Sequence, residues 1–193
     1  MKVFWFDCET TGVDSKRNAI IQLAYIVEID GKRVDSGVFE SSGFTGCEIS
    51  PKALEVNGYT TERIAGFAPE AALYAALIDL FSRYVDRFDK QDKFIAGGYN
   101  VDFDMRFLRE LWARHGDKYF GAWFAFGYID PALIMRVFQY AGIFEEMPRM
   151  RLTDLAEHFG VNTKGAHDAL ADVHMTIEVV NRIMEKVESH YVS

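Results

Sequence analysis

A short apolar run near the start of the chain is followed at once by two acidic residues. Residues 3–6 (VFWF) are typical of a buried β-strand. Asp7 and Glu9 follow at positions i and i+2, a spacing that directs both side chains to one face of a strand. Two acids at the end of a core strand repel each other, so a divalent cation held by oxygen ligands is their simplest partner. The alternative is a strand that ends in solvated acids.

Composition places the chain among globular proteins. Its 193 residues are 49% hydrophobic and 15% aromatic, which excludes a disordered chain and predicts one domain over residues 1–193. We find no apolar segment of signal-peptide or membrane-spanning length. Cys8 and Cys47 stand in no metal-binding or redox spacing, and we expect Cys8 to be buried, facing away from the acids. These features favour a cytoplasmic location and no membrane partner.

The net charge of −8 at first argues against a nucleic-acid partner. That objection is weak if some of the acids are metal ligands. Two divalent cations would add four positive charges and bring −8 to −4, with the change concentrated at the site.

The first half of the chain predicts an antiparallel meander followed by helices. Residues 19–29 and 34–39 are predicted strands joined by the hairpin signal Asp30-Gly31. A short helix is expected over residues 51–56, and Thr60 or Thr61 is expected to cap a further turn. Pro69 opens a helix predicted to reach about Phe88, with this apolar stripe: Leu73, Leu77, Leu80, Phe81, Tyr84 and Phe88.

The second half alternates predicted strands with helices, which together with the meander predicts a mixed sheet covered by helices. Residues 94–96 and a segment ending at Ile129 are predicted strands. Helices are expected from about 101 to 115, 131 to 141, 153 to 159 and 167 to 187. The stripe of the last helix is Val173, Ile177, Val180, Met184 and Val187. The aromatic segment 119–128 suits core packing, with a dimer patch or a base-stacking surface as alternatives.

Acidic residues recur at two further places where strand ends and helix starts are expected. Asp104 shares a helix face with leucines, which indicates a paired or metal-bound acid, or alternatively an acid that serves the helix dipole. Asp168 and Asp172 lie beside His167, and their i, i+4 spacing does not choose between them. Carboxylates that meet at one sheet edge would form a hard-metal site, and a histidine at its rim could accept a proton from water.

Three motifs in order resemble those of the DEDDh 3′→5′ exonucleases. They are residues 6–12 (FDCETTG), 100–104 (NVDFD) and 167–172 (HDALAD). The resemblance covers almost the whole chain. It implies an α/β, ribonuclease H-like fold: a five-stranded mixed sheet flanked by helices, with the first three strands antiparallel. The strand order inferred from the residues agrees with that fold.

The resemblance also implies the chemistry of the site. Asp7, Glu9, Asp104 and Asp172 would bind two Mg²⁺ or Mn²⁺ ions, and His167 would be the general base. Asp168 would cap its helix. The products would be nucleoside 5′-monophosphates released from the 3′ end of single-stranded DNA.

Substrate contacts follow from the same resemblance. Backbone groups near Thr10 and Thr11 would hold the terminal 3′-hydroxyl, and bases would stack on aromatic rings. The chain has Tyr99 and Asn57 at places where the family often has histidine, so its substrate preference is open. The full set of expected substrate-binding residues is Thr10, Thr11, Gly12, Asn57, Tyr59, Asn100 and Phe103.

Three other functions are weighed against trimming of DNA. The first is an exoribonuclease, since the motifs do not separate RNA from DNA. The second is a proofreading subunit that acts with a polymerase partner. The chain ends at Ser193, just after the last helix, so we expect no C-terminal tether of the kind found in the bacterial replicative proofreading subunit. The third is a non-catalytic binder, which would lack a catalytic residue, whereas all five are present. Homodimerisation, as in some relatives, would involve the aromatic segment 119–128.

Overall fold

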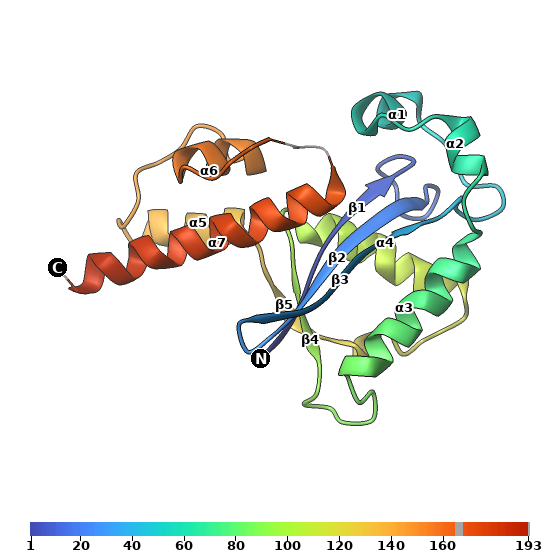
Figure 1. Cartoon of the computed structure of the whole chain (residues 1–193), viewed down its shortest axis with the longest axis horizontal. Helices are drawn as coiled ribbons and strands as arrows, with labels where there is room; N and C mark the ends of the chain where they lie inside the picture. Colours follow the sequence, from blue (N-terminus) through green and yellow to red (C-terminus); the bar gives the residue numbers. More distant parts are fainter. Residues whose placement is uncertain (165–167, 193) are drawn as a thin grey trace.

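The computed structural model describes residues 1–164 and 168–192. Five strands form one sheet in the spatial order β3-β2-β1-β4-β5 (Figure 1). β1 pairs antiparallel with β2 and parallel with β4, so the predicted mixed sheet is confirmed. The strands are β1 (Lys2–Thr10), β2 (Ile20–Ile29), β3 (Lys32–Glu40), β4 (Phe94–Gly97) and β5 (Phe124–Ile129).

The central position of β1 explains why the chain begins with an unbroken apolar run. Both faces of this strand are covered, so neighbouring side chains are buried in opposite directions. Phe4 and Phe6 enter one core, whereas Val3 and Trp5 enter another on the reverse face. The predicted hairpin that follows is also confirmed, because Asp30 and Gly31 both have positive φ, at 49° and 76°.

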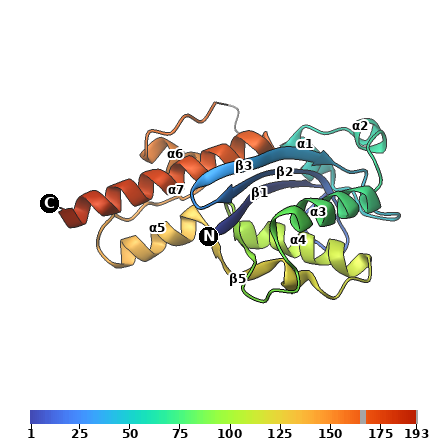
Figure 2. The ribbon, with the colours of Figure 1, turned by 60° about the horizontal axis from the view of Figure 1, so that its bottom comes forward.

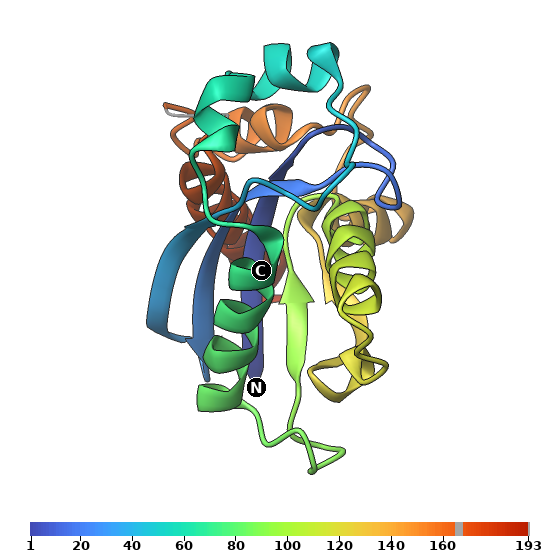
Figure 3. The same cartoon turned by 90° about the vertical axis from the view of Figure 1, so that its right-hand side faces the viewer.

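One face of the sheet is covered by one layer of helices, and the other face by two layers. α3 (Glu70–Tyr84) and α4 (Val101–Arg114) pack on the face that carries Phe4 and Phe6. α7 (Ala169–Val192) covers the other face, and α5 (Pro131–Tyr140) and α6 (Leu152–His158) pack against α7 in turn (Figure 2). α1 (Pro51–Asn57) and α2 (Thr61–Ala65) lie beyond the C-terminal end of β1 (Figure 3). A 3₁₀ turn, Phe120–Ala122, precedes β5.

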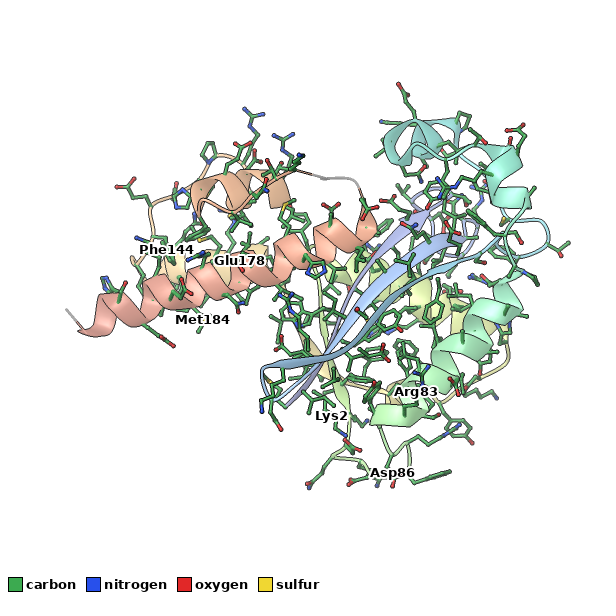
Figure 4. The ribbon with its side chains drawn as sticks, viewed as in Figure 1. Lys2, Arg83, Asp86, Phe144, Glu178 and Met184 are labelled. Atoms are coloured by element: carbon green, nitrogen blue, oxygen red, sulfur yellow. The ribbon has the colours of Figure 1, made fainter. Side chains whose placement is uncertain are left out.

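The predicted helix over residues 69–88 is too long at its C-terminal end. α3 ends at Tyr84, and Phe88 is 88% exposed instead of completing the apolar stripe. Lys2 explains the early end, because its ammonium group donates to the carbonyl of Tyr84 at 2.5 Å and pairs with Asp92 (Figure 4). Asp86 then caps the backbone N–H of Phe88 at 3.0 Å, a local turn that competes with helix.

The predicted apolar stripe of α7 is also wrong at one residue. Met184 is 41% exposed, and Ile183 beside it is fully buried (Figure 4). The reason is that α7 has two apolar faces, since it lies between the sheet and the pair α5 and α6. A single stripe at helical spacing describes only one of those faces.

The aromatic segment 119–128 divides between core and surface. Trp123 and Phe124 are buried, as core packing predicts, whereas Tyr119 and Phe126 are exposed. Phe126 lies where the pairing of β4 and β5 is irregular. None of the helices in the described ranges combines the length and apolar character that a membrane crossing needs.

Phe81 tests the packing of the larger core. Its ring lies 5.0–5.8 Å from the ring centroids of five aromatic neighbours: Phe4, Phe94, Trp112, Trp123 and Phe124. We expect Phe81→Ala to lower the free energy of unfolding by about 3–5 kcal/mol, because it leaves a cavity in this cluster. The exposed Phe88 is the matched control, and Phe88→Ala should change stability by less than about 0.5 kcal/mol. Urea denaturation measures both, and equal losses would contradict the assignment of these two rings.

Candidate active site

The C-terminal part of β1 presents two acids on one face, as the i, i+2 spacing predicts. Asp7 and Glu9 are both half-buried and follow Val3 and Trp5 on the α7 face of the sheet. Cys8 between them is buried in the opposite core, which confirms its expected direction. The first turn of α7 brings Asp172 to the same place, where its charge acts on Asp7. Three predicted ligands therefore meet where β1 and α7 approach each other.

Asp104 reaches this site from the other face of the sheet. It lies in the first turn of α4 and is only 3% exposed. One of its carboxylate oxygens accepts the backbone N–H of Cys8 at 3.2 Å, so Asp104 is fixed to β1 between Asp7 and Glu9. The structure thus brings all four predicted acids together, with β1 as their common support.

The closeness of these acids is visible in their pKa values. Burial, and to a smaller extent the charges of Glu9 and Asp172, together raise the pKa of Asp7 to about 8. Burial and the charge of Asp7 raise the pKa of Asp104 well above its usual range, although the N–H of Cys8 opposes this shift. The acids therefore resist being ionised together, and positive charge placed among them would relieve that repulsion.

The donor set suits a hard divalent cation such as Mg²⁺ or Mn²⁺, because every donor is a carboxylate oxygen. Within the described ranges, no group of three or more His, Cys, Asp or Glu side chains is arranged so that it could hold a metal ion. The fit therefore rests on donor chemistry and on the mutual repulsion of Asp7, Glu9, Asp104 and Asp172.

Two predictions concern the start of α7. His167, the expected base, lies outside the described residues. Asp168 accepts the backbone N–H of Ala171 at 3.0 Å, which confirms its expected role as a cap. Spacing left the choice between Asp168 and Asp172 open, and the fold favours Asp172, because its charge acts on Asp7.

The turn that follows β1 is a tightly hydrogen-bonded segment. Thr11 is fully buried, and its hydroxyl donates to the carbonyl of Glu48 at 2.6 Å and accepts the N–H of Ala19 at 2.9 Å. Its own N–H and carbonyl are bonded to Ala19 and Ser50. Thr10 donates to the carbonyl of Gly12 at 2.7 Å. Because its polar groups are engaged, Thr11 acts here as a support for the site.

A cavity of about 600 Å³ lies beside the acids. Five of the predicted site residues line it: Glu9, Thr10, Gly12, Asn57 and Phe103. The sequence reading missed other lining residues from the loop after β1 and from α1, such as Val13, Asn18, Ile49, Ala53 and Val56. Val13 directly follows the first motif, which was a usable signal, whereas the approach of α1 depends on tertiary structure.

Besides the buried Thr11, two predicted substrate residues, Tyr59 and Asn100, are not among those that line this cavity. Tyr59 is 7% exposed and packs under the guanidinium of Arg63, whose Cζ lies 4.3 Å from its ring centroid. Asn100 adopts the left-handed conformation, with φ of 51°, between β4 and α4. Both residues support the walls of the site, and contact of either with substrate stays a prediction.

Asp7→Asn should stabilise the protein when divalent cations are removed. The pKa of Asp7 in the folded state, about 8, exceeds its ordinary value of 3.8, so between these values the folded protein binds more protons than the unfolded chain. Wild-type stability therefore falls as pH rises through this window, and an uncharged asparagine removes that fall. Near pH 8 we expect Asp7→Asn to melt higher by roughly 2–4 °C, the equivalent of about 1 kcal/mol.

The measurement is a series of melting curves in a chelator from acidic to alkaline pH. Mn²⁺ should then raise the melting temperature of the wild type more than that of Asp7→Asn. Asp79→Asn is the matched control, since Asp79 is 75% exposed and pairs with Arg83 at 3.0 Å. Equal or lower stability of Asp7→Asn near pH 8 would contradict the proposed repulsion.

Known proteins resemble this chain over most of its length. DNA polymerase III subunit epsilon of Aquifex aeolicus is 24% identical over 189 residues, which are 96% of this chain and 81% of that subunit. Ribonuclease T of Haemophilus influenzae is 28% identical over 90% of this chain and 75% of that enzyme. DNA polymerase III PolC-type of Lacticaseibacillus paracasei is 28% identical over 89% of this chain, and the chain spans only 10% of its length.

Solved structures share the fold. The zinc-bound complex of E. coli ExoI with single-stranded DNA superposes with a TM-score of 0.79 at 24% identity, over 96% of this chain and 40% of that one. Residues 4–180 match the family described as Exonuclease (RNase_T). The chain therefore belongs to the Exonuclease family.

Proposed function

We propose that this protein removes nucleoside 5′-monophosphates from the 3′ end of single-stranded DNA with the help of two Mg²⁺ or Mn²⁺ ions. The observation that carries the proposal is the cluster of four acids beside a cavity of about 600 Å³. That volume lies within the usual range for sites that take small molecules, so the cavity has room for one nucleotide. Glu9 belongs to both the cluster and the cavity lining and joins them.

The four acids would bind and orient the divalent cations. Asp7 lies at the centre of the set, because its pKa responds to Glu9 and Asp172, and because its charge acts on Asp104. Asp7 would therefore be the central ligand, and Glu9, Asp172 and Asp104 would supply the other ligands. When bound, the cations lower the pKa of water and stabilise the negative charge of the phosphodiester and of the leaving oxygen.

His167 is the proposed general base on the strength of its motif. It stands five residues before Asp172 in the sequence, at the approach to α7. There it would accept the proton of the attacking water, and the leaving 3′ oxygen would be protonated in turn.

The walls of the cavity account for cutting at a strand end. The end of β1, the loop that follows it, α1 and α4 all contribute to the lining. A terminal nucleotide would lie between the backbone near Thr10 and Gly12 and the exposed apolar side chains of Val13 and Val56. Phe103 offers the base an aromatic face, which binds any base by stacking. Such contacts select an end and tolerate any sequence.

The likeness to ExoI, solved with single-stranded DNA, favours DNA as the substrate. The likeness to ribonuclease T supports a second candidate, an exoribonuclease. The DNA polymerase III relatives support a third arrangement, in which the protein acts with a polymerase partner.

Loss of either central acid should abolish hydrolysis and leave the fold intact. We expect Asp7→Ala and Asp172→Ala to reduce 3′ trimming of a 5′-labelled oligonucleotide to background, because each removes a proposed metal ligand. Glu178→Ala is the matched control on α7, since Glu178 pairs with Arg182 at 3.1 Å, away from the cavity (Figure 4). Full activity of Asp7→Ala, or activity that survives a chelator, would refute the mechanism.

His167→Ala should slow hydrolysis by roughly 10²–10⁴-fold, the usual contribution of a general base. Single-turnover rates measure the loss directly. Binding of the oligonucleotide should be retained, because the acids and the cavity are unchanged. A loss of less than about tenfold would reject His167 as the base.

The choice of substrate is tested with DNA and RNA oligomers of one sequence. The proposal predicts a higher kcat/KM on single-stranded DNA than on RNA and than on duplex DNA. A preference for RNA would instead establish the exoribonuclease. Activity that appears only when a polymerase is added would establish the third arrangement.

A further inference from the structure

Asn18 is a buried polar residue with no part in the proposed chemistry. It is 7% exposed, and its side chain makes two hydrogen bonds in opposite directions. The amide oxygen accepts the backbone N–H of Asp14 at 3.0 Å, and the amide nitrogen donates to the carbonyl of Glu48 at 2.8 Å. An amide carries its acceptor and its donor on two separate atoms, so one side chain can bind both groups.

The carbonyl of Glu48 receives a second side chain from the same loop. The hydroxyl of Thr11 donates to it at 2.6 Å, so both lone pairs of this oxygen are used. We call this arrangement, the side chains of Thr11 and Asn18 on the carbonyl of Glu48, the clasp. It joins both ends of the loop after β1 to a segment thirty residues further along the chain.

The clasp fixes the position of α1. Backbone bonds from Glu48 to Arg17 at 2.7 Å and from Ser50 to Thr11 at 2.7 Å lie beside it, and α1 begins at Pro51 directly afterwards. At the other end of α1, the amide of Asn57 donates to the carbonyl of Thr10 at 3.1 Å. α1 is thus attached at both ends to the backbone that carries the acids of β1.

This attachment sets the width of the cavity. Gly12 and Val13 line it from the loop, and Ala53 and Val56 line it from α1. The side chains of the clasp link these two walls, together with the backbone bonds of Glu48 and Ser50 and the amide of Asn57. A nucleotide seated between the walls would be aligned with Asp7 and Glu9 only while the clasp holds them at this separation.

Asn18 also explains why residue 12 is glycine. A Cβ atom added at Gly12 would meet the side-chain amide of Asn18 at 2.4–2.6 Å, far inside van der Waals contact. φ at Gly12 is not in the left-handed region, so backbone conformation does not require glycine here. The requirement comes from Asn18, whose side chain packs against Gly12 and lines the cavity with it.

We propose that Asn18 is a positioning residue that sets the seat of the 3′-terminal nucleotide by holding the loop after β1 against α1. The inference rests on the proposed function, since it concerns the cavity that would take that nucleotide. Asn18 acts through Gly12 and through α1, and it leaves the acid cluster itself unchanged. Its substitution should therefore weaken nucleotide binding without removing the metal ligands.

The test compares Asn18→Ala and Asn18→Asp with the wild type. Asn18→Asp keeps the shape and the acceptor for Asp14 but sets a carboxylate against the carbonyl of Glu48, so it remains informative if Asn18→Ala folds poorly. For both variants we expect KM for the oligonucleotide to rise about tenfold and kcat to stay within about threefold, because the loss concerns binding contacts. The matched control is Asn181→Ala, at an exposed asparagine of α7.

Two binding measurements separate positioning from general damage. By calorimetry, dTMP in the presence of Mn²⁺ should bind about tenfold more weakly to the Asn18 variants. The rise in melting temperature caused by Mn²⁺ alone should match the wild type. Unchanged binding of dTMP, or an equal loss of the response to Mn²⁺, would overturn the inference. These titrations need no turnover, so they are distinguishable from a failure of the wild type to trim 3′ ends.

A double-mutant cycle tests the contact between Asn18 and Gly12. Gly12→Ala should weaken dTMP binding in the wild type, because the new methyl group displaces the amide of Asn18. In the Asn18→Ala background that amide is absent, so the same change should cost less. Additive losses would show that the two residues act separately and would overturn the inference.

Discussion

Repulsion among acids at the end of β1 is the constraint on which the rest of the structure depends. Asp7 shares this small volume with Glu9, Asp104 and Asp172, and burial deprives Asp7 and Asp104 of the water that would screen their charges. Folding alone does not neutralise such a cluster. The two large cores that close around β1 stabilise the fold against this repulsion, and positive charge placed among the acids would relieve it.

The layered architecture explains how acids from three separate segments meet. β1 lies in the middle of the sheet, so helices on either face can reach its C-terminal end. Asp104 comes from α4 on one face and Asp172 from α7 on the other. The N–H of Cys8 completes the arrangement, because it binds Asp104 at the point where the strand turns its own acids the other way.

Sequence patterns predicted the parts of the fold that local physics determines. The run before Asp7, the Asp30-Gly31 hairpin and the acid spacing each follow from periodicity or turn chemistry, and the structure confirms them. The errors occurred where distant residues intervene. α3 ends early because Lys2 binds its last carbonyl, and α7 buries Ile183 in place of Met184 because a second layer of helices covers it. No local pattern contains such information.

The residues of the candidate site also divide into those that local patterns predicted and those that depend on tertiary structure. The four acids were predictable because motifs and strand geometry place them, whereas the cavity wall formed by α1 was not. Asn18 illustrates the difference, since an asparagine after a loop usually means only a turn. Its two hydrogen bonds and its contact with Gly12 become visible only when residues 12, 14 and 48 are seen together.

The length of α7 has a mechanical consequence. Its 24 residues form a rod of about 36 Å, with Asp172 near one end and the hydrophobic cluster shared with α5 and α6 toward the other. Val173 and Ile177 pack against the sheet close to Asp172 and hold this end of α7 in place. Because Asp172 lies close to these sheet contacts, a displacement of the far end of α7 moves Asp172 much less than it moves that end. The outer layer of helices can therefore vary in sequence or bind neighbours while Asp172 stays in register with the acids of β1.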